Sequence, residues 1–201
     1  MWVKVCGMTN GVDVAQAVTA GADAVGFVVA PRSQRYVDAN SLAGLVAAAD
    51  GLTTVVVSAN QPADVIIELA IHAGADWVQP HGRFQEQVIA GAMAAGLGVL
   101  APVSVGEMVG ASGHIPEGIC LLLDTKVPGL DGGTGTTFDW SLANDMDRRF
   151  VLAGGLGPDN VAEAVAVAHP WGVDAVTMLE AAPGIKDHTK VTDFIRKAKG
   201  S

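Results

Sequence analysis

Short apolar runs alternate with alanine-rich segments along almost the whole chain, and this alternation limits the possible folds more than any other feature of the sequence. The runs are rich in β-branched residues and almost continuously apolar, which is typical of strands covered on both faces of a parallel sheet. Strands are predicted at Trp2–Cys6, Ala24–Val29, Thr53–Ser58, Trp77–Gln79, Gly98–Pro102, Ile119–Asp124, Phe150–Ala153 and Val173–Thr177. Helices are predicted at Val12–Ala20, Leu42–Ala49, Ala63–His72, Gln85–Ala95, Trp140–Asn144, Asn160–Ala168 and Val191–Lys199.

Eight strands with interleaved helices predict an α/β fold, a (βα)8 TIM barrel in which residues 1–201 form a single domain. A chain of 201 residues is at the lower limit for such a barrel, so its helices must be short. The glycine-rich segment Val103–Gly113 predicts a short or irregular helix after the fifth strand. A flavodoxin-like open sheet is the alternative, but it normally needs fewer strands. In both folds the ligand site lies at the carboxyl ends of the strands.

One turn motif recurs where a predicted helix leads into a strand. The segments Ala20–Ala24 and Ala73–Trp77 both begin Ala-Gly-Ala-Asp. The glycine is expected to end the helix in a left-handed conformation, and the aspartate to open the turn into the strand. The segment Trp171–Ala175 looks similar, but its Asp174 is expected to lie inside the strand.

Charge and composition exclude several classes of protein. The formal net charge is −9, so the basic surface typical of a nucleic-acid-binding protein is not expected. The apolar runs are far shorter than the roughly 20 residues that span a bilayer, and the first residues do not follow the pattern of a signal peptide. Two cysteines, Cys6 and Cys120, form no disulfide framework, which favours a cytoplasmic protein. Because the net charge repels anions at long range, an anionic ligand must be held by local groups.

Cys6 lies at the end of the first predicted strand and is followed by Gly7. Side chains alternate across a strand, so Lys4 and Cys6 share the face that points into a barrel. Cys6 is either a small buried apolar residue or a base, and a base must be a thiolate. An ordinary thiol has a pKa of ~8.5, which a cation such as Lys4 could lower. Lys4 is interpreted as the structural partner of an inward carboxylate, with a Schiff-base amine as the alternative.

A carboxylate, Asp124, closes the sixth predicted strand. A carboxylate at the end of an apolar run is costly unless it is paired, solvated or used in chemistry. The glycine-rich segment Asp131–Gly135 that follows either folds over a ligand or is an ordinary flexible connection. Cys120 lies within the same strand without a titratable neighbour in the sequence, and it is interpreted as a core residue.

Three further strand ends carry candidate binding residues. Gln79 and His81 share a face at the end of the fourth strand, where each either faces a ligand or has a structural role. Gly154 and Gly155 precede a predicted helix and favour a phosphate site built from backbone N–H groups, with a tight turn and an Asn or Asp cap as the alternative. Arg35, after the second strand, is either a carboxylate ligand or a solvated surface charge.

Taken together, these motifs resemble the phosphoribosylanthranilate isomerase family, which are (βα)8-barrel enzymes of tryptophan biosynthesis. The resemblance covers nearly the whole chain, and its motifs are specific as an ordered set rather than singly. They are Lys4–Thr9, Gly21–Phe27, Ser33–Val37, Val78–Gly82, Leu122–Asp124, Gly132–Gly135 with Phe138–Trp140, Ala153–Leu156 and Pro183–Asp187. The resemblance implies an Amadori rearrangement of N-(5′-phosphoribosyl)anthranilate to 1-(2-carboxyphenylamino)-1-deoxyribulose 5-phosphate, without a cofactor or a metal.

The resemblance also implies roles for individual residues. Cys6 is the implied general base and Asp124 the implied general acid, and Arg35 is implied to hold the anthranilate carboxylate. Phosphate binding is implied for Gly154 and Gly155, and Thr177 could still donate a hydroxyl group there. Further substrate contacts are implied for Gln79, His81 and Asp174. The expected partner is a small phosphorylated substrate, with no nucleic acid or membrane, and the expected state is a monomer or homodimer in the cytoplasm.

Three segments depart from the family's pattern. Pro80 stands where an apolar residue, usually Leu, is expected, and Ser58–Gln61 varies a strand end that usually reads Phe-Val-Asn. After the last strand, Val176, Thr177 and Met178 stand where the family usually has Ser-Ser-Gly. Met178 removes the steric freedom of the glycine and adds bulk, so we expect weaker or re-routed phosphate binding.

Three other functions stay open at this stage. A related isomerase of a phosphoribosyl amine, from the histidine pathway, uses a carboxylate where Cys6 stands, so the thiol argues against it. A barrel that binds a sugar phosphate with reduced or absent activity is suggested by Met178. A lyase that forms a Schiff base on Lys4 is the most distant alternative.

Overall fold

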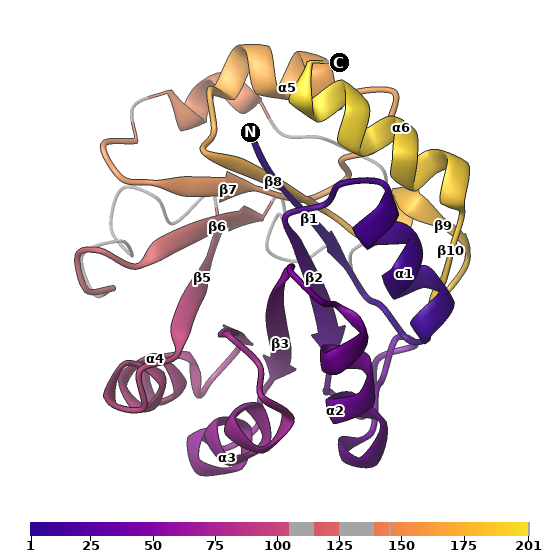
Figure 1. Cartoon of the computed structure of the whole chain (residues 1–201). Coiled ribbons are helices and arrows are strands. Elements are labelled where there is room, and N and C mark those ends of the chain that lie inside the picture. The colour runs from indigo at the N-terminus through magenta and orange to yellow at the C-terminus, as the bar shows by residue number, and fades with distance from the viewer. Residues whose placement is uncertain (105–114, 125–138, 145, 201) are drawn as a thin grey trace.

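The computed structural model describes residues 1–104, 115–124, 139–144 and 146–200, and within them eight parallel strands close into a barrel. The strands follow one another in sequence order, and β8 pairs with β1 (Figure 1). This closure confirms the predicted barrel and shows that the open flavodoxin-like sheet is wrong. The strands are β1 Trp2–Cys6, β2 Ala24–Val28, β3 Thr53–Ala59, β4 Trp77–His81, β5 Gly98–Ser104, β6 Cys120–Asp124, β7 Phe150–Leu152 and β8 Gly172–Ala175.

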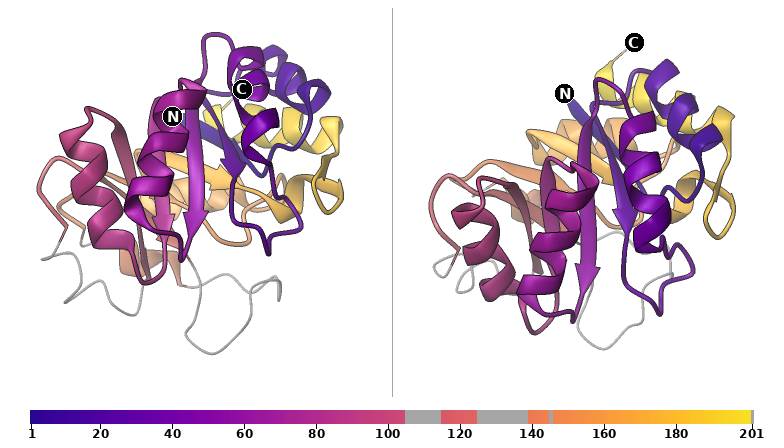
Figure 2. Two further views of the ribbon diagram at one scale, coloured as in Figure 1. Left: turned by 90° about the horizontal axis from the view of Figure 1, so that it is seen from below. Right: turned by 60° about the horizontal axis from the view of Figure 1, so that its bottom comes forward.

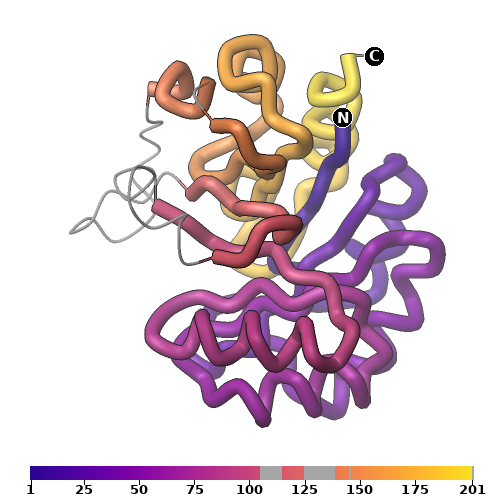
Figure 3. Tube along the Cα trace, turned by 90° about the vertical axis from the view of Figure 1, so that its left-hand side faces the viewer, coloured from indigo at the N-terminus to yellow at the C-terminus, as the bar shows by residue number. Residues whose placement is uncertain are grey.

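Helices form an outer layer around the strands (Figures 1 and 2). They are α1 Gly11–Thr19, α2 Ala39–Ala48, α3 Ala63–Ala73, α4 Gln85–Ala94, α5 Val161–Ala168 and α6 His188–Lys199. Each has 8 to 12 residues, as the short chain predicts. Figure 3 shows α3 and α4 side by side on this outer layer. No helix in the described ranges is long and apolar enough to cross a membrane.

The segments around β8 and η3 differ from the prediction. The helix expected at Trp140–Asn144 is a 3-10 turn, η3, at Trp140–Ala143. Strand β8 ends at Ala175, and Thr177 lies in a second 3-10 turn, η4, at Thr177–Leu179, because Val176 leaves the extended conformation with φ −128° and ψ −83°.

A two-stranded hairpin was missing from the prediction. It consists of β9, Glu180–Ala182, and β10, Ile185–Lys186, which pair in antiparallel fashion. Strands of two or three residues are too short to show a period in the sequence, although Pro183 and Gly184 mark the turn, and Gly184 has a φ of 81°. The expected helix after β5 and the glycine-rich segment Asp131–Gly135 lie outside the described residues.

Pro80 is accommodated inside β4. Strand β4 pairs with β3 as far as His81, but it pairs with β5 only at Trp77 and Val78. A proline lacks the N–H group that a central strand needs for its ladder of hydrogen bonds. Pro80 therefore lies beyond the residues through which β4 pairs with β5.

The alternation of side chains divides the apolar core into two parts. Outward side chains of the strands, such as Val5, Phe27 and Leu123, pack against the helices in one large cluster. Inward side chains fill the barrel itself, including Leu100, Cys120, Leu122, Val151 and Ala153. The interpretation of Cys120 as a core residue is confirmed, and burial raises the pKa of its thiol to about 11.

The aspartates of the recurring turn bind the neighbouring strand. Asp23 Oδ2 accepts a hydrogen bond of 2.8 Å from the backbone N–H of Val3. Asp76 Oδ2 likewise accepts bonds from the N–H and the hydroxyl of Thr54, at 2.8 and 2.7 Å. The motif therefore joins β2 to β1 and β4 to β3, and helps to set the register of the barrel. Gly21 and Gly74 have φ values of 80° and 72°, as predicted for helix ends.

Three tryptophans close the amino-terminal end of the barrel interior. The Trp2 ring stacks between Trp77 and Trp171, with centroid distances of 5.9 and 5.0 Å. Two glycines make the room: a Cβ added at Gly98 would overlap the Trp77 indole, and one at Gly172 would lie 2.8 Å from the Trp2 carbonyl oxygen. The polar site residues are therefore confined to the opposite, carboxyl-terminal end.

Replacing Gly98 with alanine is expected to destabilise the protein by about 1–3 kcal/mol, because the added methyl group overlaps the Trp77 ring. Gly44→Ala is the control: Gly44 lies exposed in α2 with nothing within 4 Å of an added Cβ, and the change is expected to stabilise by roughly 0.5–1 kcal/mol. Urea unfolding of the two variants measures both effects. Equal stabilities would contradict this account of the tryptophan packing.

Candidate active site

Five of the predicted site residues lie inside the barrel toward the carboxyl ends of the strands. Lys4, Cys6, Gln79 and Asp174 are at least 96% buried, and Asp124 is half-buried at the end of β6. Cys6 packs with inward residues of β3, and Asp124 has the same strand parity as the inward Cys120 and Leu122. Asp124 and Asp174 are close enough for their negative charges to repel each other. The fold therefore brings the predicted residues from four separate strands to one end of the barrel.

Lys4 and Asp174 form an ion pair in the barrel interior. Lys4 Nζ lies 2.9 Å from Asp174 Oδ2, and the two side chains are 0% and 4% exposed. The strands that carry them are neighbours, with Lys4 opposite Asp174 in the β1–β8 register. This geometry confirms that Lys4 is the structural partner of an inward carboxylate.

Cys6 shares its space with the Lys4 ammonium group. Gly26 on β2 makes this possible, because a Cβ at that position would lie 2.6 Å from Cys6 Sγ and 3.2 Å from Lys4 Nζ. Burial raises the pKa of the Cys6 thiol above its ordinary value, while the positive charges of Lys4 and Lys186 oppose this shift and Asp174 adds to it. Lys4 thus favours the thiolate as predicted, but the cost of desolvation outweighs this effect.

Two buried acceptor atoms of these site residues lack hydrogen-bond partners within the described part of the chain. They are Asp174 Oδ1 and Gln79 Oε1. The other end of the Gln79 amide lies 2.9 Å from His81 Nε2, so His81 holds the amide from the rim of the barrel. Buried polar atoms are normally hydrogen-bonded, and these two acceptors therefore suit the hydroxyl groups of a ligand.

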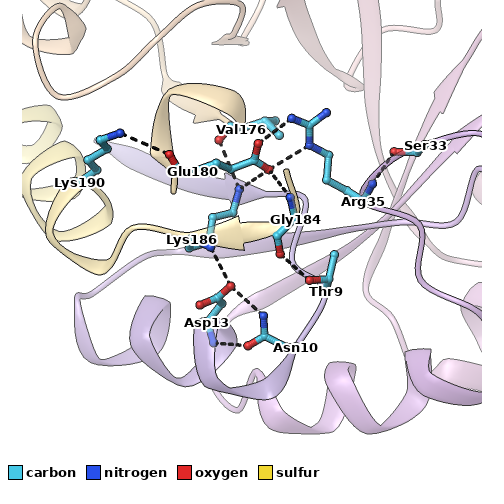
Figure 4. A network of polar contacts seen from close by, with 10 residues as sticks. All are labelled: Thr9, Asn10, Asp13, Ser33, Arg35, Val176, Glu180, Gly184, Lys186 and Lys190. Atoms are coloured by element: carbon cyan, nitrogen blue, oxygen red, sulfur yellow. Dashed lines mark hydrogen bonds and ion pairs between the residues drawn. The ribbon is translucent and has the colours of Figure 1, made fainter. Parts of the chain in front are cut away.

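Arg35 comes to the same end of the barrel from the loop after β2, where Glu180 of β9 holds it (Figure 4). Arg35 Nε donates to Glu180 Oε1 at 2.9 Å, and Arg35 Nη2 donates to Glu180 Oε2 at 2.6 Å. Lys186 Nζ lies 3.5 Å from Glu180 Oε1. The hydrogen bonds that Arg35 donates to Glu180 raise the pKa of the guanidinium, so its charge is permanent.

Glu180 and Lys186 were missed as functional residues in the sequence. Lys186 belongs to the Pro183–Asp187 motif, which carried no assigned role, and Glu180 follows the variant segment after β8. The turn signal at Pro183 and Gly184 was the one feature that could have placed the two on facing strands. Nothing in the sequence pattern indicates that Arg35 would reach them.

The hairpin that carries Glu180 is anchored to the loop after β1 and to the first turn of α1. Asp13 Oδ2 accepts from the Lys186 backbone N–H at 2.9 Å, and Asp13 Oδ1 lies 2.8 Å from His188 Nε2. Thr9 Oγ1 donates to the Gly184 carbonyl oxygen. Burial opposes ionisation of Asp13, but the hydrogen bonds with Lys186, His188 and Asn10 hold the pKa of its carboxyl below the ordinary value. The anchor is therefore a permanently charged carboxylate at neutral pH.

The expected phosphate residues lie in the turn after β7. Gly154 and Gly155 have φ values of 87° and 66°, which are rarely adopted by residues with a side chain. Helix α5 begins at Val161, close to the predicted start at Asn160, and the Asn160 side chain makes no capping bond to it. Asn160 instead braces the turn, since its side chain accepts from Gly157 N at 2.9 Å and donates to Gly155 O at 3.0 Å.

Met178 lies over this same turn. Its side chain is partly exposed, and a Cβ added at Gly157 would lie 2.8 Å from the Met178 Cβ. The backbone of η4 therefore approaches the turn after β7 closely, and Gly157 provides the room that Met178 needs. Thr177 lies beside Met178 in η4.

A metal centre finds no support in the described residues, where the His, Cys, Asp and Glu side chains form no group of three or more that could hold an ion.

Comparison with known proteins identifies the family. A family model described as N-(5′-phosphoribosyl)anthranilate (PRA) isomerase matches residues 3–197. The chain belongs to this family. It is 39% identical to the N-(5′-phosphoribosyl)anthranilate isomerase of Haloferax volcanii over 98% of this chain and 92% of that protein.

Solved structures of the family superpose on the whole chain. The phosphoribosyl anthranilate isomerase of Thermotoga maritima has a TM-score of 0.90 and 36% identity, with both chains fully covered. A phosphoribosyl anthranilate isomerase in complex with reduced 1-(o-carboxyphenylamino)-1-deoxyribulose 5-phosphate has a TM-score of 0.86 and 34% identity, also with both chains fully covered.

Replacing Gly157 with alanine is expected to destabilise this isomerase-family barrel by about 1–3 kcal/mol, because the new methyl group meets Met178 Cβ. The second substitution Met178→Gly is expected to recover part of that loss, since it removes the colliding atom. Denaturant unfolding of the two single variants and the double variant measures the coupling. Strictly additive effects would contradict the contact.

Proposed function

We propose that the protein converts N-(5′-phosphoribosyl)anthranilate to 1-(2-carboxyphenylamino)-1-deoxyribulose 5-phosphate by an Amadori rearrangement. The observation that carries the proposal is the placement of Cys6 and Asp124, one on β1 and one on β6, at the same end of one barrel interior. An isomerisation of this kind needs one proton donor and one acceptor on either side of a single substrate.

The reaction follows from these two groups. The Asp124 carboxylic acid donates a proton to the ribose ring oxygen, the C1′–O bond breaks, and the nitrogen lone pair forms an iminium. The Cys6 thiolate then removes the proton from C2′, which gives an enolamine and a thiol. Tautomerisation of the enolamine to the ketone completes a rearrangement in which no atom is gained or lost. The Lys4 ammonium beside Cys6 favours the thiolate that the second step requires.

The remaining residues bind the substrate in this proposal. The Arg35 guanidinium holds the anthranilate carboxylate, because two parallel N–H groups match two carboxylate oxygens. The unpartnered acceptors of Asp174 and Gln79 receive ribose hydroxyl groups, and His81 orients the Gln79 amide. The phosphate binds at Gly154, Gly155 and Thr177.

We further propose that the protein acts in the cytoplasm, where its partner is a small phosphorylated substrate. Its proposed oligomeric state is a monomer or a homodimer. Sedimentation equilibrium of the purified chain distinguishes these two states.

Turnover of phosphoribosylanthranilate by the purified protein tests the proposed function. Cys6→Ala and Asp124→Asn are each expected to lower kcat by ~10²–10⁴-fold, because each removes a positioned acid–base group. Fluorescence of the anthranilate group follows the reaction, and Cys120→Ala is the matched control because that thiol lies in the core cluster rather than near Lys4. Binding without turnover in the unchanged protein would contradict the proposal and support a sugar-phosphate-binding barrel instead.

The pH profile tests the charges around Cys6. If Cys6 is the base, kcat/KM rises with pH as its thiol ionises. Asp174→Asn removes a negative charge that raises the pKa of Cys6, so the rising limb is expected to move to lower pH. Glu163→Gln makes the same charge change on the exposed side of α5 and is expected to leave the limb unchanged. A shift to higher pH in the Asp174 variant would show that Cys6 is not the titrating base.

A further inference from the structure

We propose that Glu180 is the positioning residue for Arg35: it occupies one edge of the guanidinium and leaves the other edge aimed at the substrate carboxylate, and thereby sets the preference for a carboxylate-bearing substrate. This inference rests on the proposed function, since it concerns how that substrate is recognised. It goes beyond the two acid–base groups and assigns a role to a residue that touches no substrate.

The first observation is the geometry of the pair. Glu180 accepts hydrogen bonds from Nε and Nη2 of Arg35, at 2.9 and 2.6 Å. These two nitrogen atoms form the side edge of the guanidinium. The end edge consists of Nη1 and the second N–H of Nη2, and Nη1 has no hydrogen-bond partner among the described residues. This end edge offers two parallel N–H groups, as a bidentate carboxylate requires. The Arg35 side chain is 21% exposed, so the edge can be reached.

The second observation is the charge balance around Glu180. Its side chain is 4% exposed and lies between two cations, Arg35 and Lys186. The Gly184 backbone N–H also donates to Glu180 Oε1, at 3.2 Å. One carboxylate therefore faces two positive groups, and a single positive charge remains for the ligand. Without Lys186, the pair of Glu180 and Arg35 would be neutral, and the chain's net charge of −9 would repel an anionic substrate.

The third observation is that Glu180 is held in place by more contacts of its backbone than Arg35 is. Glu180 is held by its own hairpin, which Thr9 in the loop after β1 and Asp13 in the first turn of α1 anchor. Lys190 Nζ of α6 also donates to the Glu180 carbonyl oxygen at 3.3 Å. Arg35 lies in a loop, although Gly7 gives its stem room: a Cβ there would lie 3.3 Å from Arg35 Cγ. Ordering a long side chain before the ligand arrives removes part of the entropy cost of binding.

The test compares two stable probes in isothermal titration calorimetry. One is reduced 1-(o-carboxyphenylamino)-1-deoxyribulose 5-phosphate, and the other is the same compound without the carboxyl group. Glu180→Asp keeps the negative charge but withdraws it by one methylene, so it cannot hold both guanidinium bonds. We expect this variant to lower the ratio of the two affinities by about 2- to 10-fold, which corresponds to the ordering of one long side chain, and to leave the affinity for the second probe within twofold.

The same comparison in an Arg35→Ala background shows whether Glu180 acts through Arg35. There the Glu180→Asp change is expected to have no further effect on the affinity ratio. Glu163→Asp, on the exposed side of α5, removes the same methylene group and serves as the control; it is expected to leave the ratio unchanged. An unchanged ratio in Glu180→Asp, or an equal loss with and without Arg35, would overturn the inference.

A measurement on the unchanged protein covers the case in which Glu180→Asp fails to fold. In ¹⁵N NMR, the Arg35 side chain is expected to be ordered, and its Nε–H proton to exchange slowly with solvent, before any probe is added. An Arg35 signal that becomes ordered only when the carboxylate probe binds would overturn the inference. Failure of the proposed function gives a different result, because the unchanged protein would then not turn over phosphoribosylanthranilate at all.

Discussion

The buried ion pair between Lys4 and Asp174 is the interaction on which the rest of the site depends. It joins β1 to β8, the two strands that close the barrel, and it places two buried charges inside the barrel. Removing one partner of such a pair typically costs about 3–5 kcal/mol, because the other charge is left unpaired. A pair that mainly served stability could be replaced by apolar side chains at little cost. Its position directly beside Cys6 instead suits the role that we propose for that thiol.

Local charge, rather than the charge of the whole molecule, prepares this protein for an anionic substrate. Four groups near Cys6 and Arg35 alternate in sign: Lys4, Asp174, Lys186 and Glu180. Each carboxylate holds a cation in place, so these four charges balance, and the Arg35 guanidinium adds one positive charge at the barrel's carboxyl end. The apolar and aromatic residues that fill the other end keep water away from these groups, which strengthens each interaction.

Much of the fold and part of the site could be predicted from local sequence signals. Continuous apolar strands, short helices and the turn aspartates follow from periods and turn chemistry that a few neighbouring residues determine. The inward placement of Cys6 follows from strand parity, with the apolar Val3 and Val5 on the other face, whereas that of Asp174 is implied by the family resemblance. Glu180 could not be assigned in this way, because its role depends on a hairpin too short to show a period and on an arginine 145 residues away in the chain. The brace from Asn160 could not be predicted either, since its bonds run back into the turn rather than into helix α5.

The sequence by itself determined the order of strands and helices, the family, and which residues share the inner face of each strand, because these properties depend on spacing and on ordered motifs along the chain. Only the tertiary structure decided how those residues are charged and held. Closing the barrel brings Lys4 against Asp174 and buries Cys6, and docking the last hairpin brings Glu180 against Arg35. Hydrogen-bond geometry and desolvation arise only when distant segments meet, so they leave no trace in the spacing of residues.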